Sequence, residues 1–292
     1  MGTDNGASQA AGAGTADQLA SRISRRNLLD ELNMMLTSPY YFLNIMLTSL
    51  YVVFREYYRH KPIQQGMLFF GEVRDYESWE RYVGFLCGCY GAFRFIKARS
   101  RMAGLTSLLD FAQLFVGIMA MVCSPILLAY LVLAYALIYL LIPQPMYPLA
   151  DVMEPLTPEH LAEDVRKPGT DVTWVVYYYA PWHPACRHMA PELADLARRY
   201  GGTDKLKFAM LDVGEYSKAA TRLGIELSPV SQQLPTMALY EKGEEVARLP
   251  AKKAGGAGFR AGGFKAKDAI RALELDMRFT RAMQKSVEKK GQ

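Results

Sequence analysis

The sequence predicts a membrane-anchored protein with N-terminal transmembrane α-helices and a following α/β domain, whose central mixed sheet is flanked by helices. Three observations lead to this fold class. The hydrophobic content of 51% is slightly high for a soluble protein, and most of the excess lies before residue 143. A run of β-branched and aromatic residues then occupies 172–179, and the later segments alternate between strand-like and helix-like patterns. At 292 residues the chain is long enough for two such parts.

Composition and charge narrow the function classes. The net charge of +5 is modest and the basic residues are scattered, without a Lys/Arg stripe interleaved with aromatic residues, which argues against nucleic-acid binding. Residues 1–29 begin with a small, polar, aperiodic segment that has too little apolar surface to offset the entropy of ordering, so we predict a disordered N-terminus. Three of the four cysteines, Cys87, Cys89 and Cys123, lie in apolar segments and are expected to act as small hydrophobes.

Residues 30–142 form the predicted membrane domain, with candidate spans at 34–54, 82–96, 105–123 and 126–142. The first has about 21 residues, enough to cross a bilayer, and a cleaved N-terminal signal is the alternative. In the second, Gly84 and Gly88 form a G-x-x-x-G pair that either suits close helix packing or is loosely packed filler.

The long apolar stretch 105–142 favours two spans over one. As a single helix it would be about 57 Å long, against a hydrocarbon core of about 30 Å. Ser124-Pro125 near its middle offers a break, because proline removes a backbone donor. Asp110 and Gln113 place the first of these spans at the membrane interface or against another helix.

A cluster of basic residues between the second and third candidate spans predicts on which side of the membrane the second domain lies. Arg94, Lys97, Arg99 and Arg101 are expected to face the cytosol by the positive-inside rule. If 105–142 is a hairpin, the chain returns to the cytosol and the domain after residue 143 is cytosolic. If 105–142 crosses once, that domain is lumenal. We favour the cytosolic arrangement.

The second domain is predicted over 143–275, in the order β-α-β-α-β-β-α. The strands are expected at 172–179, 206–213, 237–240 and 245–249, and the helices at 184–200, 217–223 and from 267 onward. A short helix at 156–165 precedes them, with Thr157 as N-cap and Pro158 at its first position. Residues 276–292 are expected to form a basic tail that ends in KKGQ.

The motif APWHPAC, residues 180–186, joins the first strand to the second domain's first long helix. Trp182, Cys186 and Pro191, together with the step Leu234-Pro235-Thr236, resemble the thioredoxin fold. The segment LDVGEYSKAATRLGIELSPVSQQLPTMALYEKGEE, residues 211–245, is similar to the thioredoxin-related transmembrane protein 2 family. The likeness covers roughly 30–290 and is close over 172–250. Cis geometry at the bond before Pro235 is implied by the resemblance.

The resemblance carries expectations and two departures. Members are similar to endoplasmic-reticulum membrane proteins, some at contacts with mitochondria, with a single cysteine in the turn and a lysine-rich C-terminus. Their turn typically has serine before the cysteine, where this chain has His183. Their strand carries an acid where this chain has Tyr177. In a dithiol enzyme of this fold the first cysteine attacks as thiolate and the second resolves the mixed disulfide. Cys186 matches the resolving position, so a dithiol cycle is not expected.

Several hypotheses compete for His183 and Cys186. Cys186 is the candidate redox thiol, as a sensor or in a mixed disulfide with a client, and a His183 imidazolium nearby would raise its thiolate fraction. The plain alternative makes His183 a solvated helix-start residue and packs Cys186 beneath the turn. His183, Cys186 and His188 do not complete a four-ligand metal site, so neither metal nor other cofactor is predicted.

A protein-binding groove is the second prediction for this region. In thioredoxin folds the segment before the cis-proline presents backbone groups to an extended peptide. Trp182, His183, Leu234 and Pro235 would line such a groove and bind protein clients or partner proteins. The alternative is that Pro235 only shapes the fold.

The C-terminus supplies a location signal. Lys289 and Lys290 resemble the dilysine signal for retrieval to the endoplasmic reticulum, which is read in the cytosol and implies coat proteins as partners. Chance is the competing explanation in a basic tail. The sequence leaves homo-oligomerisation open.

These observations predict a multi-span endoplasmic-reticulum protein with a degenerate thioredoxin domain, acting as a non-catalytic or redox-sensing adaptor or regulator. The alternative is a protein disulfide isomerase-like or single-thiol oxidoreductase that uses Cys186. A structural protein of membrane contacts is a third hypothesis.

Overall fold

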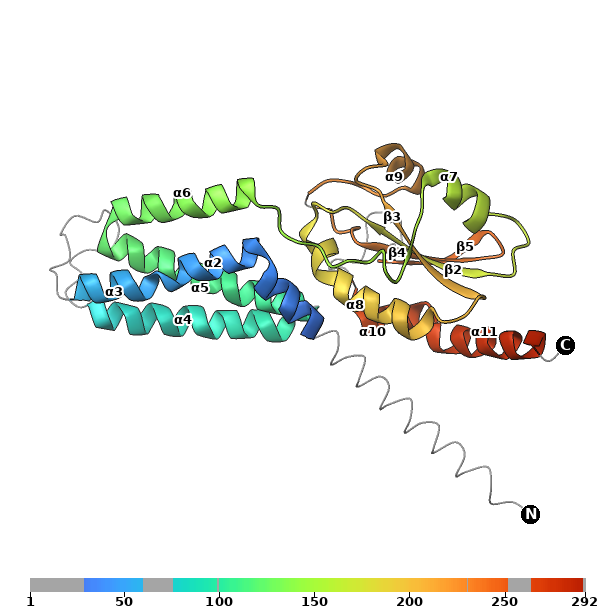
Figure 1. Ribbon diagram of the computed structural model, residues 1–292, viewed down its shortest axis with the longest axis horizontal. Coiled ribbons are helices and arrows are strands. Elements are labelled where there is room, and N and C mark those ends of the chain that lie inside the picture. Colours follow the sequence, from blue (N-terminus) through green and yellow to red (C-terminus); the bar gives the residue numbers. More distant parts are fainter. Residues whose placement is uncertain (1–28, 60–75, 99, 230, 252–263, 291–292) are drawn as a thin grey trace, which may run out of the picture. The chain divides into compact units, whose positions relative to one another are not determined.

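The structure is a computed structural model that describes residues 29–59, 76–98, 100–229, 231–251 and 264–290. The chain divides into two compact units (Figure 1). A helical unit comprises Leu32–Pro145, and an α/β unit comprises Met146–Gln292 grouped with Met1–Glu31. The N-terminal segment predicted to be disordered lies almost wholly outside the described residues.

Helices make up most of the described part of the helical unit, and they follow a helical stretch at residues 29–37. They are α2 (Pro39–Ser49), α3 (Tyr51–Arg59), α4 (Tyr76–Lys97), α5 (Arg101–Cys123) and α6 (Pro125–Leu141). The break predicted at Ser124-Pro125 is present: Ser124 has extended backbone and ends α5, and Pro125 opens α6 at a position that needs no N–H.

The first candidate span, 34–54, is not one helix. Helical backbone covers residues 29–37, and Ser38 then adopts an extended conformation (φ −69°, ψ 126°) before Pro39 opens α2. A further boundary at Leu50 separates α2 from α3. The reason for the first break is local, because proline disfavours helical backbone in the residue that precedes it.

One helix among the described residues is a clear candidate to span a membrane by length and composition. This is α5, with 23 residues and mean hydropathy 1.8 over its best window, of which 22% is buried. Helix α6 is apolar but has 17 residues, about 26 Å at the helical rise. Neighbouring helices contact α5 at residues that include Gln113 and Phe111. Gln113 of α5 donates to the Asn44 side chain of α2 at 2.9 Å. A Cβ on Gly91 would lie 3.4 Å from Phe111, whereas Gly88 faces open space.

The α/β unit contains a five-stranded mixed sheet in the order β1-β3-β2-β4-β5. β2 and β3 are parallel, β4 is antiparallel to β2, and β4 and β5 form an antiparallel hairpin. The predicted strands are confirmed to within a few residues, and β1, a two-residue addition parallel to β3, was not predicted. The bounds are β1 (Glu154–Pro155), β2 (Thr173–Tyr179), β3 (Leu206–Asp212), β4 (Thr236–Glu241) and β5 (Glu244–Leu249).

Helices cover both faces of this sheet (Figure 1). α7 and α9 lie on one face, and α8, α10 and α11 lie on the other. The predicted helix at 156–165 is present as α7 followed by a π-helical turn, and Thr157 caps it by accepting from the His160 amide at 3.3 Å. The bounds are α7 (Pro158–His160), the π-helix (Leu161–Val165), α8 (Pro184–Tyr200), α9 (Ser217–Leu223), α10 (Ala266–Ala272) and α11 (Leu275–Lys290).

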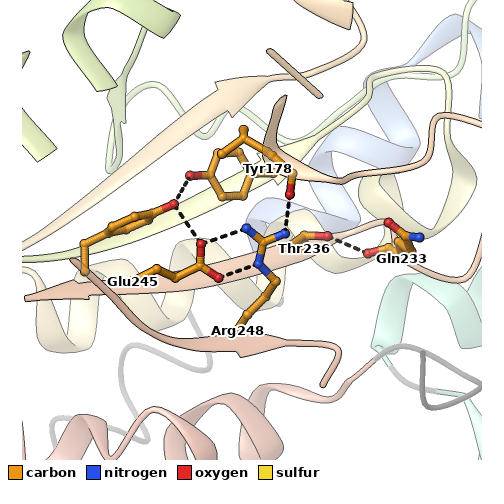
Figure 2. Close-up of polar contacts among 7 residues, drawn as sticks. Tyr178, Gln233, Thr236, Glu245 and Arg248 are labelled. Carbon is orange, nitrogen blue, oxygen red and sulfur yellow. Dashed lines mark hydrogen bonds and ion pairs between the residues drawn. The ribbon is translucent and has the colours of Figure 1, made fainter. Parts of the chain in front are cut away.

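A polar network fastens the β4–β5 hairpin to the rest of the unit (Figure 2). The buried hydroxyls of Tyr178 and Tyr240 lie 2.8 Å apart, and Tyr240 donates to Glu245 at 3.2 Å. Arg248 binds Glu245 through two nitrogens at 2.5 and 2.7 Å and donates to the Leu223 carbonyl at 2.7 Å. The network joins strand β5 to helix α9 and to the central strand β2.

The predicted boundary between domain and tail at residue 275 falls at the start of α11, so that assignment is corrected. Leu275 is fully buried, and Tyr200 of α8 donates to Asp276 at 2.6 Å. Phe279 packs edge to face on the Tyr200 ring, and Ala282 is buried. The described exposed residues of α11 are charged, polar and apolar, and its other face packs on the domain, which the composition of the helix does not reveal.

Candidate functional site

The candidate site is the turn between β2 and α8, where the sequence has APWHPAC. β2 ends at Tyr179 and α8 begins at Pro184. His183 is the N-cap of α8 with extended backbone (φ −82°, ψ 121°), and its carbonyl accepts the Cys186 amide at 3.1 Å. This order places His183 at the N-terminus of the helix and Cys186 within its first turn.

The Cys186 thiol is inside the protein. The residue is 0% exposed and belongs to the main hydrophobic core of the α/β unit. Burial raises the pKa of its thiol to about 11, an effect that hydrogen bonds with the Ala180 backbone and the Tyr177 side chain offset in part. Because the thiolate is the nucleophile, a protonated and covered sulfur is poorly suited to attack a disulfide. All four cysteines are free.

His183 is also buried, with 7% exposure, which contradicts the expectation of a solvated helix-start residue. Its ring is hydrogen-bonded to the Ser231 backbone, and Nδ1 has no hydrogen-bond partner within the described part of the chain. Burial is the main cause that lowers the pKa of the imidazole, and the Arg187 charge adds to it. The ring is therefore neutral at neutral pH, so the hypothesis that an imidazolium activates Cys186 has no support.

Tyr177 occupies the strand position where related proteins carry an acid. It is 0% exposed, its ring stacks on Tyr179 at 5.5 Å between centroids, and its hydroxyl donates to the Cys186 carbonyl at 3.2 Å. Burial raises the pKa of the phenol well above its ordinary value. A neutral phenol whose hydroxyl is bound to a backbone carbonyl is not equipped to move protons as a carboxylate does.

Trp182 is the exposed member of the turn, with 41% exposure. Its indole lies against the next loop, because a Cβ on Gly214 would come within 3.1 Å of the indole nitrogen, and its ring meets His183 edge to face at 5.7 Å. Arg187 holds the turn by donating to the carbonyls of Pro181 at 2.6 Å and Trp182 at 3.1 Å. The turn thus presents a braced aromatic side chain to solvent.

The loop before β4 carries Leu234 and Pro235, the other two residues of the predicted peptide-binding groove. The Leu234-Pro235 bond is cis, as the resemblance implied. Thr236 donates to the Gln233 carbonyl at 2.7 Å (Figure 2), and the Gln233 side chain accepts the Glu226 amide at 2.9 Å. These bonds fix the path of the chain into the sheet.

The four predicted groove residues therefore differ in access. Trp182 is exposed, whereas His183, Leu234 (2% exposed) and Pro235 are buried. The His183 ring lies near the Ser231 backbone, so the loop before β4 approaches the turn here. A peptide that approaches from solvent would contact Trp182 first. Contact with the Leu234 backbone would require the loop before β4 to move away from the turn.

Three contributors were missed from the sequence. Arg187 and Ser231 are described above, and a serine in a loop carries no signal for such a contact. Asp212 accepts the Gly214 and Glu215 amides at 2.8 and 3.1 Å, and its charge helps to raise the pKa of Cys186. The sequence LDVGE at a strand end is a pattern for such an aspartate-centred turn.

Metal binding and the C-terminal lysines are the remaining points. Within the residues that the structure describes, no group of three or more His, Cys, Asp or Glu side chains is placed to hold a metal ion. Lys289 and Lys290 form the last residues of α11, and Gly291 and Gln292 lie outside the described residues.

Comparison with known proteins agrees with this geometry. The thioredoxin family model matches residues 152–256. A thioredoxin-related transmembrane protein 2 homolog of Drosophila melanogaster is 30% identical over 74% of this chain and 80% of its own length. The chain belongs to the thioredoxin-related transmembrane protein 2 family.

Other members of the thioredoxin-related transmembrane protein 2 family match over shorter stretches. The Caenorhabditis elegans homolog is 30% identical over 41% of this chain, and the Xenopus laevis protein is 38% identical over 32%. These alignments span only 44% and 35% of the two relatives' lengths. Among solved structures, mitochondrial thioredoxin 3 of Saccharomyces cerevisiae is 17% identical over 44% of this chain and 98% of its own, with a TM-score of 0.32.

Proposed function

We propose that this chain is an endoplasmic-reticulum membrane protein whose thioredoxin-like domain is a non-catalytic adaptor or regulator that binds a segment of a partner protein beside Trp182. The observation that carries this proposal is the contrast within one turn. Cys186, the one thiol in this turn, is fully buried with a raised pKa, whereas Trp182 is 41% exposed on the same turn. Exposed tryptophans are frequent anchors of protein interfaces.

Loss of the dithiol chemistry has two independent supports. His183 stands in the attacking position and is neutral, and Tyr177 is tied to the Cys186 carbonyl. A domain that only binds a partner still functions with these two substitutions, because binding needs a fixed surface and no electron transfer. The alternative, an oxidoreductase that uses Cys186, requires the sulfur to become exposed and ionised.

A cross-linking experiment distinguishes the two functions. A photoreactive benzoylphenylalanine is placed at Trp182 in the full chain in cells, and at Arg222 on the exposed side of α9 as the matched control. We expect protein adducts from position 182 and not from 222, and they should persist in a Cys186→Ala background. Mixed disulfides that need Cys186, together with insulin reduction by the wild-type chain, would favour the oxidoreductase instead.

The membrane arrangement is the second part of the proposal. α5 and α6 would cross as a hairpin, with the basic residues around Arg94 and Arg101 in the cytosol. The α/β unit is then cytosolic, and Lys289 and Lys290 are accessible as a retrieval signal. This arrangement agrees with two separate features of the sequence, the positive charge between helices and the lysine position.

Burial of Cys186 makes it a poor topology probe, so an exposed thiol is needed. Lys218→Cys on α9 supplies one. After selective permeabilisation of the plasma membrane, we expect an impermeant maleimide to label Lys218→Cys. Protection until the internal membranes are opened would place the domain in the lumen. Replacement of Lys289 and Lys290 by serine should release the protein from the endoplasmic reticulum if the signal is used.

A further inference from the structure

A pocket of about 310 Å³ lies at the end of the sheet away from the APWHPAC turn. β2 begins at Thr173 beside this pocket and runs to Tyr179, after which the turn follows. Four segments line it: the start of β2, the residue before β3, the β4–β5 turn and helix α11. The residues that matter here are Asp171, Lys205, Glu241, Lys242, Arg278 and Arg281.

Cations outnumber carboxylates in this pocket. The lining contains two lysines, two arginines and two carboxylates. Both carboxylates are already engaged, since Lys205 binds Asp171 at 2.8 Å and Arg278 is paired with Glu241. Arg278 is also held by the Leu273 carbonyl at 2.9 Å and by Glu274 at 3.5 Å. These contacts build a fixed frame with no spare negative charge on the lining side chains.

Lys242 and Arg281 are the two cations left over. Within the described residues neither has a carboxylate at ion-pair distance, and Arg281 donates to the Met277 sulfur at 3.5 Å. The Lys242 backbone is positioned by a tight turn: its φ is +54°, and its carbonyl accepts the Gly169 amide at 3.3 Å. A Cβ on Gly243 would lie 2.6 Å from the Lys167 carbonyl oxygen, so the turn needs glycine there. Arg281 lies three residues after Arg278, on the same helix face.

We propose that this pocket binds a phosphate monoester. Lys242 and Arg281 line the same pocket, and two cations in one pocket favour a compact dianion. The hydroxyls of Thr170 and Thr173, also in the lining, supply neutral donors to the oxygens of such a ligand. The volume suits a phosphate group with a small organic part, because it lies near the lower limit of about 300 Å³ for ligand pockets. The same group is carried by soluble metabolites and by the headgroup of phosphatidic acid.

Two probes separate these sources. The full chain in detergent micelles is titrated by calorimetry with glycerol 3-phosphate at physiological ionic strength. The full chain in phosphatidylcholine nanodiscs is compared with nanodiscs that contain phosphatidic acid or phosphatidylglycerol, with thermal unfolding as the measurement. We expect saturable binding of glycerol 3-phosphate, or a rise in the unfolding temperature with phosphatidic acid that exceeds the rise with phosphatidylglycerol. The first result identifies a soluble ligand and the second a lipid headgroup.

The variant Lys242→Gln/Arg281→Gln tests the site, and Lys218→Gln/Arg222→Gln on α9 is the matched control because it removes the same charge from another surface. The first variant should weaken binding by about tenfold or more, since it removes two charge-assisted contacts. The control should bind as the wild type does. Equal weakening of both variants, equal responses to the two anionic lipids without glycerol 3-phosphate binding, or no binding of any probe would each overturn the proposal.

Discussion

Cys186 should react slowly with maleimides, at a rate that climbs steadily with pH. Burial raises the pKa of its thiol from 9.0 to about 11. One pKa unit is a tenfold change in the thiolate fraction, so at neutral pH Cys186 carries about 100-fold less thiolate than an unperturbed cysteine. The thiolate is the reactive form, and the 0% exposure of the residue lowers the rate further. Alkylation should therefore be slower by at least this factor.

The assay uses the full chain in detergent with N-ethylmaleimide at low concentration, and peptide mass spectrometry to follow Cys186 by itself. Lys218→Cys, an exposed thiol in the same unit, is the internal reference. The Cys186 rate should increase about tenfold per pH unit between about pH 6 and 9 without a plateau. A plateau in this range, or a rate at neutral pH within about tenfold of the reference, would refute the argument that burial disables this thiol.

Three further predictions concern the same unit. The Arg248→Met variant leaves Glu245 without its ion-pair partner. Because these side chains are 15% and 25% exposed, we expect the free energy of unfolding in urea titrations to fall by about 2 kcal/mol; an unchanged midpoint would show that the network does not stabilise the domain. Tyr177→Phe removes one buried hydrogen bond and should cost about 1 kcal/mol in the same titration, and a cost near zero would show that this contact is not made. His183→Cys restores Cys-x-x-Cys and should form a disulfide with Cys186 when oxidised glutathione accepts the two electrons, seen as a loss of two hydrogen atoms in the intact mass, yet reduce insulin only slowly; fast turnover would show that the strand carboxylate is dispensable.

Sequence patterns predicted helix ends correctly where the residues at the end itself determine it. The bounds of α8 were predicted correctly because Pro184 suits the first helical position and Gly201 follows the last one. The division at Ser124-Pro125 follows from the missing proline donor. The same effect at Pro39, inside an apolar run, was overlooked, and it divides the first candidate span.

Elements that depend on distant partners were not predicted. β1 has two residues and exists through its parallel pairing with β3. α11 is rich in charged residues, and its place in the domain depends on the burial of Leu275 and on the hydrogen bond that Tyr200, 76 residues earlier, donates to Asp276. A pattern along the chain does not contain such partners.

By itself the sequence determined the thioredoxin-like order of elements and the chemistry that the turn has lost, because His183 and Tyr177 are identities that can be compared directly with what a dithiol cycle needs. Only the tertiary structure decided the state of the residues that remain. It buries His183 against the Ser231 backbone and seals Cys186 in the core, and it leaves Trp182 exposed. The physical reason is that exposure and pKa depend on desolvation by groups remote in sequence, which residue identity alone does not specify.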